Sequence, residues 1–287
     1  MKFRRLCLFL VAFAAIGDRS PGQGIIADNS AASKTEIANA VAQVCSSDKT
    51  TLKSGEPVGC QSCPSGSDFD GQPLGWHLVH ITTGHFTSTT QENIILSSLG
   101  CESHSNNFGG SFIFLRDTAK PKLLRYNPSL ITGRCHKSRF TDGGDFLICQ
   151  DEYGAQSTVW SFIYAISFDE AGTGNVFSRL FETLDSTQTC GKDSEGKPGG
   201  SIQNSKIMSI KFHERNGELI GLSLRATLEK KHLSRIEREA CEQNGVRTTS
   251  IPEKEYSIDF SLQGHQFKVV PASSAAFELF RKPAFPH

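Results

Sequence analysis

Short apolar runs separated by turn residues dominate the sequence from Trp76 to Val270, and they restrict this part of the chain to a fold of many short strands. Runs with an apolar period of two, bounded by glycine, asparagine and aspartate, predict antiparallel β-strands. We expect a mainly β fold with three sets of four strands. The expected strands are 76–82, 93–98, 111–116 and 122–126, then 135–140, 146–150, 158–168 and 175–184, then 206–212, 218–226, 256–262 and 266–270.

The strand expected at 158–168 has a strongly aromatic face. Its alternate positions carry Trp160, Phe162, Tyr164, Ile166 and Phe168, and the residues between them are mostly smaller. Successive side chains of a strand point to opposite faces of the sheet. We therefore expect this face to be buried.

Two segments are expected to be helical. Ser33 and Glu36 have the spacing of a capping box, and apolar residues follow at helical intervals, which predicts a short helix at about 34–44. The charged segment 228–243 has four-residue spacing of its apolar positions and fits a helix inserted into the third set, with an extended, charged edge strand as the alternative. Residues 46–72 are rich in serine, glycine, aspartate and proline and are expected to form an irregular loop tethered by disulfides.

The first residues have the layout of a secretion signal. Residues 1–5 are mostly basic, and residues 6–16 form an unbroken apolar run that ends in small residues. That run is about half as long as a membrane span requires. We expect a signal peptide at 1–17, then a linker, helix and loop at 18–74, a β-rich repeat domain at 75–271 and a C-terminal tail at 272–287. The product is expected to be secreted or periplasmic, with no membrane span.

Eight cysteines remain after the signal, which predicts disulfides in an oxidising compartment. Eight cysteines allow many pairings, so their spacing alone does not fix the connectivity. Nearness in a strand-rich fold favours Cys135 with Cys149 and Cys190 with Cys241. The other two bonds would then join Cys45, Cys60, Cys63 and Cys101, in an order that the sequence leaves open.

The charge balance argues against a nucleic-acid partner. Lysine plus arginine and aspartate plus glutamate number 30 each, and no basic patch stands out. We expect a protein or glycan partner and no nucleic acid.

A short pattern recurs near the hairpins of the three sets. Gly84-His85-Phe86 precedes Asn93 and an apolar strand, Phe140 precedes Asp142-Gly143-Gly144-Asp145 and an apolar strand, and Phe212 precedes a polar turn and a strand. This pattern resembles the FG-GAP family, the blade unit of integrin α-type β-propellers. The resemblance covers about residues 76–168, with a faint third copy at 212–222.

The resemblance implies four-stranded blades in a propeller-like or incomplete propeller arrangement, with calcium in a turn. Calcium needs several oxygen ligands, usually carboxylates at alternating positions. The turn at 88–92 offers only one carboxylate, whereas the second turn carries Asp142 and Asp145. We expect no cofactor, with calcium at these two aspartates as the alternative.

Two polar clusters are candidate sites. Cys60 and Cys63 have redox-motif spacing, but proline and a polar loop follow, so we expect structural half-cystines. Glu102 and His104 lie in a polar loop, where with His85, His136 or His213 they could make a metal or acid–base site. The competing interpretation is that Glu102 and His104 cap backbone groups.

No nucleophile elbow, zinc-protease or phosphate-loop motif is present. The first hypothesis is therefore a secreted, disulfide-stabilised binding module without enzymatic activity. The alternatives are a secreted metal-dependent hydrolase that uses the Glu102 and His104 loop, and a calcium-binding adhesion module.

Overall fold

A computed structural model describes residues 26–27, 32–45, 49–67, 75–101, 109–117, 120–155, 158–186, 190, 201–244 and 253–280. The expected signal peptide and the loop that carries Glu102 and His104 lie outside these residues.

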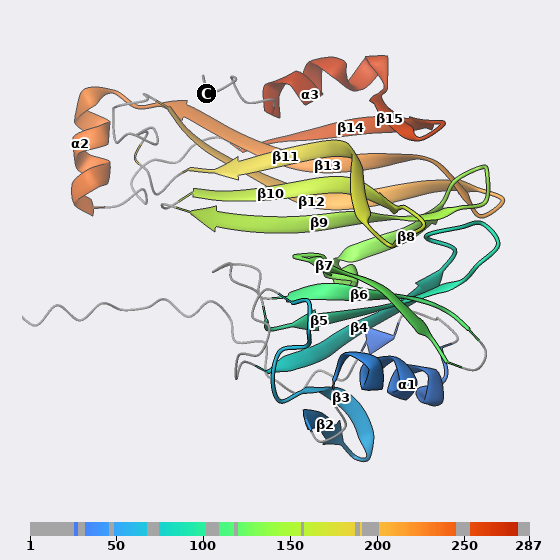
Figure 1. Cartoon of the computed structure of the whole chain (residues 1–287). Coiled ribbons are helices and arrows are strands. Elements are labelled where there is room, and N and C mark those ends of the chain that lie inside the picture. The colour runs from blue at the N-terminus through green and yellow to red at the C-terminus, as the bar shows by residue number, and fades with distance from the viewer. Residues whose placement is uncertain are drawn as a thin grey trace, which may run out of the picture.

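The strands form two antiparallel sheets, which confirms the mainly β prediction (Figure 1). The seven-stranded sheet has the order β2-β3-β4-β5-β6-β7, and β1 pairs with β4 in parallel. Its strands are β1 (Ile26–Ala27), β2 (Thr50–Lys53), β3 (Glu56–Cys60), β4 (Trp76–Gly84), β5 (Asn93–Leu99), β6 (Gly109–Leu115) and β7 (Lys122–Pro128).

The eight-stranded sheet runs in chain order from β8 to β15. Its strands are β8 (Cys135–Arg139), β9 (Asp145–Ala155), β10 (Thr158–Phe168), β11 (Gly174–Asp185), β12 (Ser201–Arg215), β13 (Glu218–His232), β14 (Lys254–Gln263) and β15 (Gln266–Val269). Each of the twelve strands expected after residue 75 has a counterpart from β4 to β15.

The expectation of an irregular loop at 46–72 was wrong for its first half. Residues 50–60 form the β2–β3 hairpin, in which Lys53 pairs with Glu56. The two residues between them, Ser54 and Gly55, have φ angles of 54° and 81°. Positive φ at both positions is the geometry of a tight hairpin turn, and the composition of the segment concealed it.

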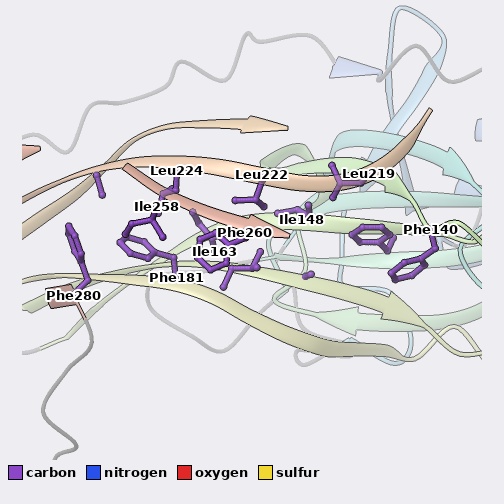
Figure 2. Packing of buried hydrophobic residues seen from close by; sticks show 14 of the residues in the cluster. Phe140, Ile148, Ile163, Phe181, Leu219, Leu222, Leu224, Ile258, Phe260 and Phe280 are labelled. Atoms are coloured by element: carbon purple, nitrogen blue, oxygen red, sulfur yellow. The ribbon is translucent and has the colours of Figure 1, made fainter. Parts of the chain in front are cut away.

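The eight-stranded sheet folds back on itself around the main core. β11 and β12 pair at one position only, Asp185 with Asn204, so the two halves of the sheet can face each other. Phe177 of β11 and Phe267 of β15 stack across the interior at 6.4 Å. Figure 2 shows the enclosed apolar side chains in one row that runs from Phe280 to Phe140.

A second apolar cluster joins the two sheets. Phe86, Ile95 and Ile113 of the β4–β7 region pack against Leu147 and Ile166 of β9 and β10. The other face of the seven-stranded sheet packs against helix α1 (Lys34–Val44), whose Ala40 and Val41 are fully buried. The seven-stranded sheet is therefore covered on both faces.

The two halves of the eight-stranded sheet pack face to face, and the seven-stranded sheet packs against the half that contains β9 and β10. Among the described residues the strands form no closed barrel or propeller. Helix α1 covers one end of the arrangement, and the outer face of β12–β14 carries polar residues such as His213, Ser223 and Asp259.

Helix α1 confirms the capping-box prediction and is tied to the sheet by charge. Ser33 and Glu36 cap each other reciprocally. Arg116, just after β6, donates to the Glu36 carboxylate from Nε at 2.6 Å and from Nη2 at 3.0 Å. The same guanidinium donates to Glu92 at 2.7 Å. Arg116 thus links helix α1 to Glu92, the residue that precedes β5.

The segment expected to be helical at 228–243 is divided. The strand β13 continues to His232, and helix α2 (Arg235–Asn244) begins after it. Residues 228–232 remain extended because they pair with β12 as far as Ser201. Both interpretations of this segment were thus correct for a part of it.

The structure fixes the disulfide connectivity. The predicted Cys135–Cys149 and Cys190–Cys241 bonds are confirmed. The four remaining cysteines pair as Cys45–Cys60 and Cys63–Cys101.

The segment expected to be a C-terminal tail contributes to the core. Residues 274–280 form helix α3 (Ser274–Phe280), and the Phe280 ring lies 4.9 Å from that of Phe181. Within the described ranges, no helix has the length and apolar character needed to cross a membrane.

Replacing Glu36 with glutamine is expected to lower the free energy of unfolding by about 1–3 kcal/mol at neutral pH, because charge-assisted hydrogen bonds are lost. The hydrogen bonds from Arg116 lower the pKa of Glu36 from 4.5 to about 2. A lowered pKa stabilises the folded state above the unfolded value, so the deficit of the variant should disappear as the pH falls from 4.5 towards 2. Urea unfolding across this range measures it.

Glu56→Gln is the matched control. Glu56 pairs with Lys34, but its side chain is 50% exposed, so its loss should change stability by less than about 1 kcal/mol. Equal effects of the two substitutions at neutral pH would contradict the role of Arg116.

Candidate functional site

A cavity of 710 Å³ lies between the segment after β7 and the outer faces of β10 and β11, and it continues to helix α3. Its walls are mostly apolar. They include Leu130, Phe162, Ile163, Tyr164, Ile166, Val176, Leu180, Phe181, Phe277 and Phe280, with the polar residues Asn127, Ser129, Asp151, Arg179 and Glu182.

The aromatic face of β10 forms part of the cavity wall, which corrects the expectation that it is buried. Phe162 and Tyr164 are only partly buried, whereas Ile163 and Ala165 on the opposite face are fully buried in the main core. The physical reason is that the eight-stranded sheet folds over the other face of β10. Ile166 and Phe168, further along the strand, are buried against the seven-stranded sheet, and Tyr164 packs partly against the same cluster.

The cavity offers two polar groups that the described residues leave unsatisfied. The Tyr164 hydroxyl has no hydrogen-bond partner among them, and burial raises its pKa to about 12, so it stays protonated and able to donate. Arg179 of β11 is exposed and makes no ion pair with a described residue. In contrast, the Asp151 carboxylate accepts a hydrogen bond from Arg134 at 3.0 Å.

Polar contacts hold the wall after β7 in place. The Asn127 side chain donates to the Gly172 carbonyl and accepts from the Gly174 N–H, both at 2.8 Å, which joins the end of β7 to the β10–β11 turn. Nearby, the Ser111 hydroxyl donates to the Leu130 carbonyl. The wall is therefore fixed before any ligand arrives.

A buried hydroxyl network anchors the next turn, η2 (Thr132–Arg134). The Thr132 hydroxyl lies 2.6 Å from that of Ser97 and 2.9 Å from His80 Nδ1. Ser97 and Thr132 are each at most 1% exposed. Because substrate could not reach these atoms, we interpret the network as structural.

The two candidate calcium ligands are engaged in other contacts. Asp145 is 4% exposed, and its carboxylate accepts from Arg139 Nε at 2.9 Å and from the His85 N–H at 2.8 Å. Asp142 accepts from the Gly144 N–H and from His265 Nε2. Asp145 therefore ties the β8–β9 hairpin to the end of β4, and a cation there would have to displace Arg139.

Two of the histidines considered with Glu102 and His104 have other partners. His136 stacks on Phe212 at 3.7 Å and pairs with Glu214, and His213 hydrogen bonds to Ser223. Within the described part of the chain, no three histidine, cysteine, aspartate or glutamate side chains are grouped to hold a metal. Glu102 and His104 themselves lie outside the described residues.

A row of His213, Ser223 and Asp259 crosses β12, β13 and β14 on the outer face. The three side chains are hydrogen bonded in a sequence that differs from that of a hydrolytic triad. The Ser223 hydroxyl lies between the imidazole and the carboxylate and donates to Asp259. In a triad the histidine must stand between the acid and the nucleophile, so that it can take the proton of the nucleophile.

Sequence reasoning missed the cavity. The alternation on β10 could have indicated it. A tyrosine in a row of aromatic residues often lies where its ring contacts apolar groups and its hydroxyl contacts water. The contributions of Leu130, Arg179 and Phe280 come from distant segments, and no local pattern connects them.

Comparisons with known proteins found no match to this chain among protein-family models, curated proteins or solved structures. The FG-GAP resemblance therefore stays a prediction.

Asp145→Asn is expected to lower the free energy of unfolding by about 1–3 kcal/mol, because a buried carboxylate loses its charge-assisted bond with Arg139. Asp142→Asn, in the same turn but exposed, should change it by less than about 0.5 kcal/mol. Thermal unfolding with calcium and with chelator measures both. Calcium that stabilises the wild type but neither variant would show instead that the turn binds the ion.

Proposed function

We propose that this is an exported, disulfide-stabilised binding protein that takes an apolar ligand into the cavity between β7, β10, β11 and α3. The observation that carries the proposal is the cavity itself. Its 710 Å³ lies within the range of about 300–1,000 Å³ that is typical of ligand sites.

The composition of the walls favours binding over catalysis. Phenylalanine, leucine, isoleucine and valine side chains dominate, and the described lining contains neither histidine nor cysteine. Removing apolar surface from water stabilises a complex by about 25 cal/mol per Å². Tyr164 and Arg179 then supply the few polar contacts that would orient a ligand.

The preformed wall supports the same proposal. Asn127 and Ser111 hold the segment after β7 through hydrogen bonds, so little of that segment has to be ordered when a ligand binds. Avoiding such an ordering cost increases affinity.

Export is proposed from the cysteines and the first residues together. Four disulfides join the described cysteines, and such bonds persist in oxidising compartments. The signal-like residues 1–17 would direct the chain to such a compartment.

Binding can be tested with N-phenyl-1-naphthylamine, a neutral probe whose fluorescence rises in apolar surroundings. We expect saturable binding to the wild type and an affinity at least about tenfold lower for Val176→Trp, because the larger ring occupies the cavity. Val159→Trp is the matched control, since Val159 is also exposed on a strand but lies outside the cavity. A probe that does not bind, or binds both variants equally, would contradict the proposal.

A further inference from the structure

The edge of β11 that faces away from β10 has no strand partner over most of its length. β11 pairs with β10 from Gly174 to Asp185, but its only paired position with β12 is Asp185. Next to that position, the backbone of β11 bonds to a side chain of β12. The Ser205 hydroxyl accepts a hydrogen bond from the Leu184 N–H and donates one to the Leu184 carbonyl. From Gly174 to Phe181, no strand of the described chain pairs with this edge.

The cavity extends around this open edge. Phe181 pairs with Ile163, whereas Arg179 pairs with the next residue, Tyr164, because the register shifts at Leu180. Phe181 and Arg179 therefore lie on opposite faces of β11 although they are only two residues apart. Both line the same cavity. A space that touches both faces of a strand must pass along its edge, where backbone N–H and C=O groups are directed outward at every second residue.

The outer edges of the two sheets carry features that discourage pairing, and the part of β11 from Gly174 to Phe181 has fewer of them, although its register with β10 shifts at two places. β2 and β15 have only four residues each, β7 contains Lys122, Arg125 and Pro128, and β8 contains Lys137 and Arg139. Short length, proline and charge are the usual means of protecting an edge. From Gly174 to Phe181, β11 has a single charge, that of Arg179.

We infer that the cavity receives an extended peptide segment of a partner protein, which adds to β11 as a further strand; this inference rests on the proposed binding function. A strand places alternate side chains on opposite faces. On one face, the side chains of the peptide meet Phe181, Phe277 and Phe280. On the other they meet Glu182 and Arg179, and Arg179 makes no ion pair with a described residue. The segment that fits therefore alternates apolar residues with residues of which at least one is acidic.

The inference is tested by selecting a displayed library of random peptides, each of about twelve residues, on the full disulfide-bonded protein. We expect enriched sequences in which apolar residues alternate with acidic ones. The most enriched peptide is then synthesised in two forms, N-methylated at either the odd or the even residues. Only one set of N–H groups faces β11 in an added strand, so one form should bind at least about tenfold more weakly and the other should bind nearly as well as the parent.

Charge reversal gives a second readout. Arg179→Glu should weaken the acidic peptide about fivefold or more and should enrich basic residues at the same position in a repeated selection. Arg179 is exposed, so the variant is expected to fold.

Three outcomes would overturn the inference. The two N-methylated forms could bind equally, the protein could associate with itself in a way that blocks the peptide, or no peptide could be enriched. If N-phenyl-1-naphthylamine still binds in the last case, only the peptide inference fails. If the probe also fails to bind, the proposed function fails with it.

Discussion

The limited pairing of β11 with β12 determines most of the architecture. A continuous ladder between these strands would hold the eight strands in one open, twisted sheet whose apolar core face would be exposed. Because pairing is confined to Asp185 and Asn204, the sheet folds at this point and encloses the core between its halves. The same interruption leaves the edge of β11 open and creates the space into which Phe277 and Phe280 of α3 project.

The two sides of β10 show how this fold produces a site. Ile163 and Ala165 are buried in the core, where Ile163 also borders the cavity, whereas Phe162 and Tyr164 on the reverse side face the gap beside β7. The gap stays open because Asn127 fixes the end of β7 to the β10–β11 turn. Contacts outside the cavity thus hold its apolar wall in place, and the described residues leave the space beside that wall open.

The local features of the fold could be predicted from the sequence. Ser33 and Glu36 predicted α1, and period-two runs predicted the strands from β4 to β15, because these signals depend on neighbouring residues. The face-to-face packing could not be predicted, since it depends on where a ladder stops, as at Asp185. For the same reason the sequence predicts a buried face for the aromatic residues of β10, part of which lines the cavity. The alternation that marks Phe162 is the same for a buried face and for a cavity wall.

The Cys190–Cys241 bond gives the folded sheet an unequal resistance to opening. It joins the connection between β11 and β12 to helix α2, at the end of the sheet where Asp185 pairs with Asn204. At the opposite end, the contacts between the half-sheets include that of His136 with Phe212 and Glu214. Under mechanical load, the two half-sheets should therefore separate first near the β8–β9 and β12–β13 turns, while the end that carries the disulfide stays joined.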